Sequence, residues 1–392
     1  MYCGIYLFVF MAEAISFCFM MTYLISLGYS TMQRSAVFSV TALAGIFGQI
    51  GIGYHCDRRH YLKPMVFVTF IIYAAANAGY YLYPGRSFVV HLLLAVATGA
   101  SMRISEGLLD SWVLESNADC RSHYGMIRAQ GSLGWAIGSP IAASIVQHAG
   151  YPFLGAGFAI VTAIHLTLAC FVPEAHKVVR SSYLTVKDVE KLLSGRRFRL
   201  IVEILFFMFI VAMTCDYAVI DKMNTLKASA AAISWSWSIQ AIVEIPLFLA
   251  GDRLAERFGM MGLLRFAAVA LGVRYLLYGL AVNVTQMVMI AGMQFFTFGI
   301  MTIAAKRLVD QQTPPELKTS GQQLAMALYN GGSLLCAPLL SGGLETAWGV
   351  NAALLTVGAI TVIPLGLSIY YSRLPKDDRT RSDMTGQERR AR

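Results

Sequence analysis

Residues 53–58 read GYHCDR, and residues 252–259 read DRLAERFG. Each stretch places an acid directly before an arginine, in a tight polar turn between two apolar runs. The two pairs are Asp57–Arg58 and Glu256–Arg257. When the pairs are aligned, they lie about half the chain apart. The repeat therefore predicts two halves of similar structure.

The composition limits what kind of protein this can be. Of the 392 residues, 57% are hydrophobic and only 14% are charged, and the mean hydropathy is +0.59. A soluble domain is about half apolar and about a quarter charged. These values exclude a disordered chain, a fibrous chain and an ordinary soluble enzyme. A membrane-spanning helix needs about 20 apolar residues, so the chain has room for roughly twelve spans and for no large soluble domain.

Twelve apolar runs are separated mostly by short connections. They cover 4–27, 36–54, 64–83, 88–114, 125–147, 152–172, 200–225, 230–250, 262–282, 285–305, 321–342 and 350–371. The pattern predicts an all-α membrane protein with twelve transmembrane helices. A polar, basic segment divides them six and six. The predicted parts are an N-terminal six-helix bundle at 1–172, a cytoplasmic linker at 173–199, a C-terminal six-helix bundle at 200–372 and a disordered cytoplasmic tail at 373–392.

The positive charges indicate the topology. The net charge is +9, and most Lys and Arg residues fall in alternate connections, in segment 173–199 and in the tail. The opposite connections hold little more than Arg34, Arg86 and Lys227. The positive-inside rule therefore predicts a multi-pass plasma membrane protein, in a bacterium the inner membrane, with both termini in the cytoplasm. Membrane topology explains the basic balance, so nucleic acid is not expected as a partner. Trp235 and Trp237 are expected in the aromatic belt at the membrane interface.

The repeated turn carries a family resemblance. GxxxDR between spans two and three is the signature of the major facilitator superfamily, although His60 stands where a glycine is usual. The resemblance covers the whole chain and implies two pseudo-symmetric six-helix bundles that rock about a central site. It implies a conformational latch formed by Asp57, Arg58, Glu256 and Arg257. We expect a monomer that binds a small-molecule solute and protons, without cofactor or metal.

Ionisable residues inside the apolar runs are candidates for function, because each costs several kcal/mol unless it is paired or hydrated. They are Glu13, Arg103, Glu106, Asp110, Arg128, Glu203, Asp216, Asp221, Glu244 and Arg274. Glu203 lies near the cytoplasmic end of its run, where a solvated side chain without a functional role is expected. Arg103, Glu106 and Asp110 have the spacing of one helix face. Buried ion pairs that only fix helix packing would explain some of these charges. Acids outnumber bases, however, and a carboxylate without a cation in a low dielectric readily binds a proton.

Residues 124–135, YGMIRAQGSLGW, form the most specific motif. Gly131 and Gly134 allow close helix approach. Arg128 can hold a carboxylate or two hydroxyl groups with its planar guanidinium. Trp135 follows two helical turns later on the same face. A tryptophan at such a position is more often a packing residue than a ligand, so both interpretations stay open.

This segment resembles the lactose permease branch, the oligosaccharide:proton symporters, which have FGxxRxxGxxGW here and an acid eighteen residues before the arginine, where this chain has Asp110. The resemblance implies that Asp110 and Arg128 bind sugar hydroxyls and that Trp135 stacks on the sugar ring. Other cavity residues of the branch match Glu244 in VEIP and Arg274 in GVRY. The predicted substrate-binding set is Asp110, Arg128, Trp135, Glu244, Gln294, Arg274 and Glu106.

The chain departs from that branch in span ten. Gln294 replaces the usual histidine, and Thr297 replaces the proton-carrying glutamate. The stretch QFFTFG around Gln294 looks more like the related phenylpropionate permeases. Another acid must then carry the proton, and the candidates are Glu244, Glu106 and Glu13.

Three transport hypotheses follow. The first is proton-coupled symport of a small polar solute such as a sugar or glycoside, by alternating access. The second is import of an aromatic acid or nucleoside. The third, ranked last, is drug:proton antiport, because the fuller antiporter motif is absent. No enzyme is expected, since the sequence has no nucleophile–base arrangement, zinc motif or phosphate loop.

Overall fold

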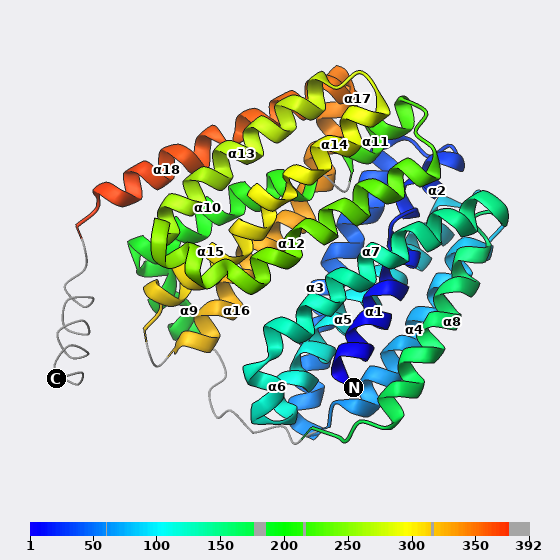
Figure 1. The fold of residues 1–392 in the computed structure, drawn as a ribbon, viewed down its shortest axis with the longest axis horizontal. Coiled ribbons are helices and arrows are strands. Elements are labelled where there is room, and N and C mark those ends of the chain that lie inside the picture. Colours follow the sequence, from blue (N-terminus) through cyan, green and yellow to red (C-terminus); the bar gives the residue numbers. More distant parts are fainter. Residues whose placement is uncertain (60, 176–185, 215–216, 315–316, 376–392) are drawn as a thin grey trace.

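The computed structural model describes residues 1–59, 61–175, 186–214, 217–314 and 317–375, apart from the side chains of residue 57 and of 186–188, 248–256 and 318–320. The regular elements of these residues are helices (Figure 1). The N-terminal half contains α1 (Tyr2–Phe17), α2 (Met20–Ser26), α3 (Thr31–Arg59), α4 (Lys63–Leu82), α5 (Phe88–Ser116), α6 (Ala118–Ser122), α7 (Tyr124–His148) and α8 (Phe153–Cys170).

The second part of the chain begins with α9 (Val186–Ser194), which lies in the segment predicted as a linker. The C-terminal half contains α10 (Arg196–Met213), α11 (Ala218–Thr225), α12 (Ala230–Phe258), α13 (Met260–Leu280), α14 (Val284–Ala291), η2 (Gly292–Phe296), α15 (Phe298–Gln312), α16 (Lys318–Met326), η4 (Ala327–Gly331), α17 (Gly332–Ile360) and α18 (Val362–Arg373). The predicted disordered tail lies outside the described residues from position 376 onward.

Nine helical segments of the described chain are long and apolar enough to cross a membrane. Two more helices, α7 and α12, have 25 and 29 residues, but polar residues such as Arg128 and Glu244 lower their hydropathy. The candidate Gly321–Arg373 covers two predicted spans, because Gly349 (φ 81°) breaks α17 with a backbone conformation that favours glycine. The twelve predicted spans are therefore present in the described part of the chain.

Several spans are less regular than the apolar runs predicted. The run 285–305 divides into α14, η2 and α15 at Thr297 (φ −115°, ψ −95°). The Thr297 hydroxyl donates to the Met293 carbonyl, and a side chain that bonds nearby backbone competes with the helical pattern. The run 200–225 likewise contains two helices, α10 and α11.

The halves lie side by side, with the N-terminal half at lower right and the C-terminal half at upper left in Figure 1. In the first half, α1 packs on α7 and α8, and α5 packs on α3 and α4. A Cβ atom at Gly134 would collide with the Leu7 carbonyl, so the close α1–α7 contact requires glycine there. The main contacts between the halves pair α7 with α12 and α3 with α17.

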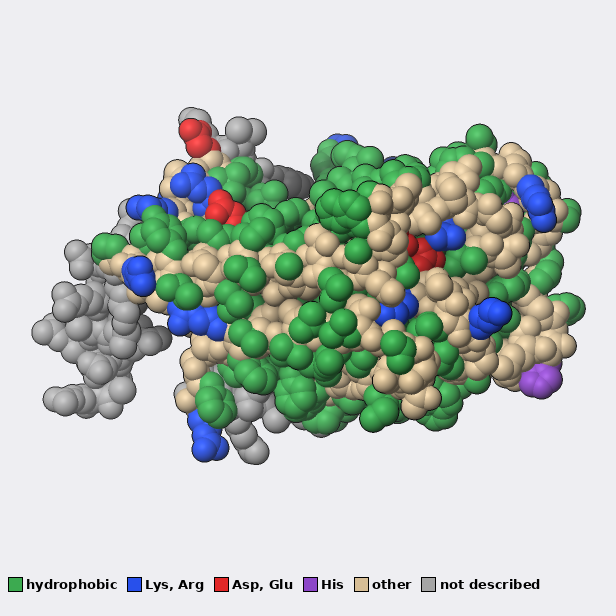
Figure 2. All heavy atoms as spheres, turned by 90° about the horizontal axis from the view of Figure 1, so that it is seen from above, with side chains coloured by type: hydrophobic (Ala, Val, Ile, Leu, Met, Phe, Trp, Pro, Cys, Tyr) green, Lys and Arg blue, Asp and Glu red, His purple; other side chains and the backbone are tan. Residues whose placement is uncertain are grey.

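We call the two ends of the helix bundle the terminal side and the distal side. The terminal side holds the N-terminus and α6, and the distal side holds α2 and α11 (Figure 1). Figure 2 shows hydrophobic side chains over much of the visible face, with Lys and Arg side chains scattered among them and fewer Asp and Glu side chains. Such a face suits contact with lipid tails, whereas the buried polar groups described next need protein partners.

Candidate functional site

Helix α5 presents three charged side chains on one face, as the sequence spacing predicted. Arg103 and Glu106 form an ion pair with an N–O distance of 3.1 Å. Asp110 accepts a hydrogen bond of 2.5 Å from the Tyr6 hydroxyl on α1. All three side chains are half-buried, so they face neither the sealed core nor open solvent.

Helix α7 places Arg128 near the charged face of α5. The Arg128 guanidinium carbon lies 4.4 Å from the centre of the Phe10 ring of α1, a cation–π distance. Its charge interacts with the carboxylates of Asp110 and Glu106. Because α1, α5 and α7 all belong to the N-terminal half, this charged cluster is a fixed part of that half.

Trp135 lies at the contact between the halves. Its ring centre is 6.1 Å from that of Phe17 on α1 and 6.1 Å from that of Trp237 on α12. Trp237 is only 9% exposed, so its predicted place in a membrane-interface belt is wrong, while Trp235 is 53% exposed. The prediction fails for Trp237 because this residue lies on the face of α12 that packs against α7. A residue on that face cannot contact lipid.

The C-terminal half contributes Glu244, Gln294 and Arg274. Gln294 donates from its side-chain nitrogen to the Glu244 carboxylate at 2.6 Å, and its oxygen accepts a hydrogen bond from Arg274. Arg274 is 2% exposed and also donates to Gln240 at 2.8 Å. Glu244 and Gln294 are half-buried. Arg274 therefore stands behind the site and orients Gln294, which in turn orients Glu244.

Glu13, one of the predicted proton carriers, is completely buried on α1. Its Oε1 atom accepts a long hydrogen bond of 3.4 Å from Ser105, and its Oε2 atom has no hydrogen-bond partner among the described residues. The charges of Glu106, Arg103 and Arg128 act on it. Glu13 thus lies beneath the charged face of α5.

The predicted residues that lie on facing helices of the two halves make up the candidate central site, called the central site below. It contains Glu106, Asp110, Arg128 and Trp135 from the N-terminal half and Glu244 and Gln294 from the C-terminal half. The two sides adjoin because α7, which carries Arg128, packs on α12, which carries Glu244. Carboxylates that accept, a guanidinium that donates in pairs and an aromatic face can together hold a hydroxylated ring.

The predicted latch residues lie at helix ends and away from this site. Asp57 and Arg58 belong to the last turn of α3, and Glu256 and Arg257 to the last turns of α12, rather than to separate tight turns. The side chains of Asp57 and Glu256 lie outside the described part of the structure. Arg58 and Arg257 are exposed. Their latch role stays a prediction.

Some polar neighbours were missed at the sequence level. Tyr6 and Phe10 share one face of α1, four residues apart, and both contact the central charges. Their spacing could have identified them.

Arg34 was expected in a loop, but it lies in the first turns of α3, is 8% exposed and pairs with Asp221 of α11. Glu345 lies beyond the apolar run that was predicted for its span. Asp216 lies outside the described residues.

Comparisons with known proteins agree with this architecture. The model of the MFS_1 like family matches residues 1–352. Maltose permease of Geobacillus stearothermophilus is 26% identical over 304 residues, which is 77% of this chain and 76% of that protein. The uncharacterized transporter YwbF of Bacillus subtilis (strain 168) is 24% identical over 384 residues, which is 96% of this chain and 94% of that protein.

Solved structures show the same fold. The crystal structure of the nucleoside transporter NupG has a TM-score of 0.80 at 15% identity and covers 95% of this chain and 98% of its own. A bacterial homolog of the human lysosomal transporter Spinster, in an inward-facing and unoccupied conformation, has a TM-score of 0.71 at 12% identity and covers 95% of each chain. The superfamily predicted from the GxxxDR turn is confirmed: the chain is a multi-pass membrane transporter and no enzyme, and it belongs to the MFS_1 like family of the major facilitator superfamily.

Proposed function

We propose that this transporter takes up a small polar solute, such as a sugar or glycoside, together with protons by alternating access. The observation that carries the proposal is the central site, whose polar groups come from both halves. A solute held by Asp110 and Arg128 on one side and Glu244 on the other draws the halves together. Each half can then release it only by moving away from the other.

The chemistry of the central site supports a hydroxylated solute. Asp110 and Glu244 accept hydrogen bonds, and the planar Arg128 donates two at once. Tyr6 holds Asp110 in place, so this acceptor needs little reordering when a solute arrives. Trp135 supplies the apolar face that a sugar ring also presents. Likeness to a maltose permease supports the same class of solute.

Glu244 is our choice for the proton carrier among the three predicted acids. Glu106 has Arg103 as a direct ion-pair partner, and Glu13 is sealed from solvent in this conformation. Glu244 is half-buried and accepts its hydrogen bond from a neutral amide. A carboxylate whose direct partner is neutral can bind a proton without losing an ion pair.

The distribution of Lys and Arg supports a cytoplasmic place for the terminal side. The exposed Arg58 and Arg257 lie at that side and can act with Asp57 and Glu256 as the latch of the closed state. In this arrangement the distal side faces outward, toward the incoming solute.

Import of a nucleoside or an aromatic acid is the second candidate. The three rings of Phe17, Trp135 and Trp237 favour it, because successive ring centres lie about 6 Å apart and an aromatic solute stacks well in such surroundings. Arg128 would then hold a carboxylate or ribose hydroxyls.

Counterflow in reconstituted vesicles tests the proposal. Vesicles preloaded with a panel of unlabelled sugars, glycosides, nucleosides and aromatic acids receive the labelled compound outside. A sugar or glycoside should exchange, and an imposed proton gradient should make it accumulate. Exchange of nucleosides or aromatic acids alone would select the second candidate. Drug efflux driven by protons would overturn both.

A further inference from the structure

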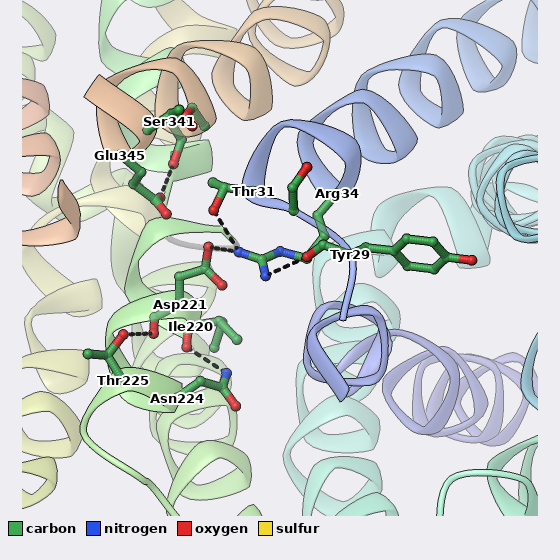
Figure 3. Close-up of polar contacts among 12 residues, drawn as sticks. Tyr29, Thr31, Arg34, Ile220, Asp221, Asn224, Thr225, Ser341 and Glu345 are labelled. Atoms are coloured by element: carbon green, nitrogen blue, oxygen red, sulfur yellow. Dashed lines mark hydrogen bonds and ion pairs between the residues drawn. The ribbon is translucent and has the colours of Figure 1, made fainter. Parts of the chain in front are cut away.

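A second polar site lies on the distal side, well away from the central site. A cavity of about 390 Å³ is lined by Arg34 and Thr31 of α3, Asp221, Asn224 and Thr225 of α11, and Glu345 of α17, together with Ile25 and Val350. Figure 3 shows these side chains converging from the two halves, with Arg34 extended from α3 toward Asp221. None of them belongs to the central site.

The Arg34–Asp221 ion pair crosses between the halves. The guanidinium Nη2 lies 2.6 Å from the Asp221 Oδ2 atom, and both residues are largely buried. Arg34 also donates to the Tyr29 carbonyl and to the Thr31 hydroxyl, each at 3.2 Å, and these acceptors lie in its own half. Separation of the halves on the distal side must therefore break the bond to Asp221, while the other two can remain.

Glu345 gives this site one more carboxyl group than it has cations. Its Oε1 atom accepts from the Ser341 hydroxyl at 2.8 Å, and Glu345 and Asp221 line the same cavity. Asp221 and Glu345 both belong to the C-terminal half, whereas Arg34 belongs to the N-terminal half. Two carboxylates beside each other cannot both stay charged cheaply without a cation, so such a pair retains a proton.

The surrounding charged and titratable groups do not supply the distal site with a second cation. Lys222, next to Asp221, donates to the carbonyls of Tyr278 and Gly279 at 2.6 and 2.8 Å, which directs its charge toward α13. On the N-terminal side, His91 reaches Arg34 only through Tyr29, whose hydroxyl lies 2.9 Å from the His91 Nδ1 atom.

The closed contact leaves one donor unsatisfied. The buried Arg34 Nε atom has no acceptor among the described residues, and an unpaired buried donor costs free energy. This cost in the closed state lowers the free energy that opening of the distal side requires.

We propose that Asp221 and Glu345 form a proton-binding site on the distal side, and that a proton bound there releases Arg34 and opens that side. The inference deepens the proposed proton coupling and rests on it for its role in transport. The proton comes from solvent on the distal side and is shared between the two carboxyl groups. No other bond is formed or broken covalently.

The direction of the pH effect follows from proton counting. When Arg34 is bound, its positive charge favours the ionised form of the carboxyl pair, so the site holds fewer protons. When Arg34 has left, the two carboxyl groups bind more protons. Acidity must therefore favour the open distal side, and alkalinity must favour the closed one. An outward-facing site of this kind would load a proton before the solute enters.

Hydrogen exchange of the purified protein tests this without any solute. Exchange would be followed at mildly acidic and mildly alkaline pH in peptides from the distal ends of α3 and α11, normalised to the unfolded chain at each pH. In the wild type, protection of both ends should fall about tenfold on acidification, which corresponds to about 1.4 kcal/mol. Unchanged protection would overturn the proposal.

Two variants should lose the pH dependence of protection, one by staying protected and the other by staying unprotected. Glu345→Gln should stay protected at both pH values, because Asp221 then keeps Arg34 without a competing acid. Asp221→Asn should be unprotected at both. Glu203→Gln is the matched control, since Glu203 is exposed on α10, and it should behave as the wild type. A pH response retained in Glu345→Gln would overturn the site even if Asp221→Asn does not fold. Because no solute is used, a negative result here leaves the counterflow test of the proposed function intact.

Discussion

The central and distal sites use the same chemical groups in different ways. In the central site, Arg128 and its carboxylate neighbours Asp110 and Glu106 belong to one half. In the distal site, Arg34 and Asp221 belong to different halves. Interactions within a rigid half survive a rocking motion, whereas a pair across the halves must break. The comparison agrees with our two proposals, in which the central charges bind the solute and the distal charges control opening.

Their surroundings differ accordingly. The central site has large aromatic neighbours, Phe10 and Trp135, which can contact a solute. The distal contact has small residues, with Ser35 of α3 packed against Gly342 of α17. Small residues let two helices close tightly and part again. Four substitutions would break or sharpen this contrast.

Arg128→Lys should have the largest effect on solute affinity. A lysine keeps the charge but loses the planar fork, so we expect affinity to fall about 100-fold, or about 2.7 kcal/mol. Isothermal titration with the solute identified by counterflow would measure it. Arg121→Lys is the control, because Arg121 is exposed on α6. Wild-type affinity in Arg128→Lys would contradict a binding role.

Glu244→Gln should separate exchange from accumulation. The amide keeps the shape of the side chain but cannot take up a proton, so counterflow should persist while a proton gradient no longer concentrates the solute. Labelled uptake with and without the gradient distinguishes the two. Glu106→Gln and Glu13→Gln serve for comparison. If Glu244→Gln still accumulates solute, one of those acids or another ion carries the coupling.

Charge exchange should rescue one site and not the other. Arg34→Asp alone should slow counterflow about tenfold, and the double variant Arg34→Asp/Asp221→Arg should recover most of the rate, because a gating pair needs only opposite charges. The matching exchange of Asp110 and Arg128 should not recover binding, since the solute needs each group in its own place. Recovery in both sites would remove the proposed difference between them.

Gly342→Ala should have the smallest effect. The added Cβ would collide with the Ser35 side chain and hold the halves apart on the distal side. We expect about a threefold loss of distal protection in hydrogen exchange, with solute affinity nearly unchanged. Gly343→Ala is the matched control, because a Cβ there meets no atom within 4 Å. Equal effects of the two variants would contradict a specific close contact.

The fold was largely predictable because membrane spans leave a strong hydropathy signal and because two acid–arginine turns repeat. The breaks within spans were not predictable, because a run such as 285–305 is equally apolar whether or not its helix is interrupted. The break depends on the Thr297 hydroxyl and its partners, which come from other turns and other helices.

The central site was predictable where its residues share a helix. The spacing of Arg103, Glu106 and Asp110 identified one face of α5, but no spacing could show that Gln294 joins Arg274 to Glu244. In the distal site only Asp221 was singled out from the sequence, and its pairing with Arg34 was missed, because the two residues lie 187 positions apart. Arg34 had the position of a loop cation, and only the packing of α3 against α17 and the ion pair with Asp221 show otherwise.

Lys222 gives the C-terminal half a continuous polar framework. Its ammonium group holds the carbonyl of Tyr278, whose hydroxyl accepts from Arg274, and Arg274 leads through Gln294 to Glu244. Asp221 adjoins one end of this chain of bonds, and the central carboxylate forms the other. Because both acids adjoin this hydrogen-bonded framework, we expect Glu244 to move together with Asp221 when Arg34 releases Asp221.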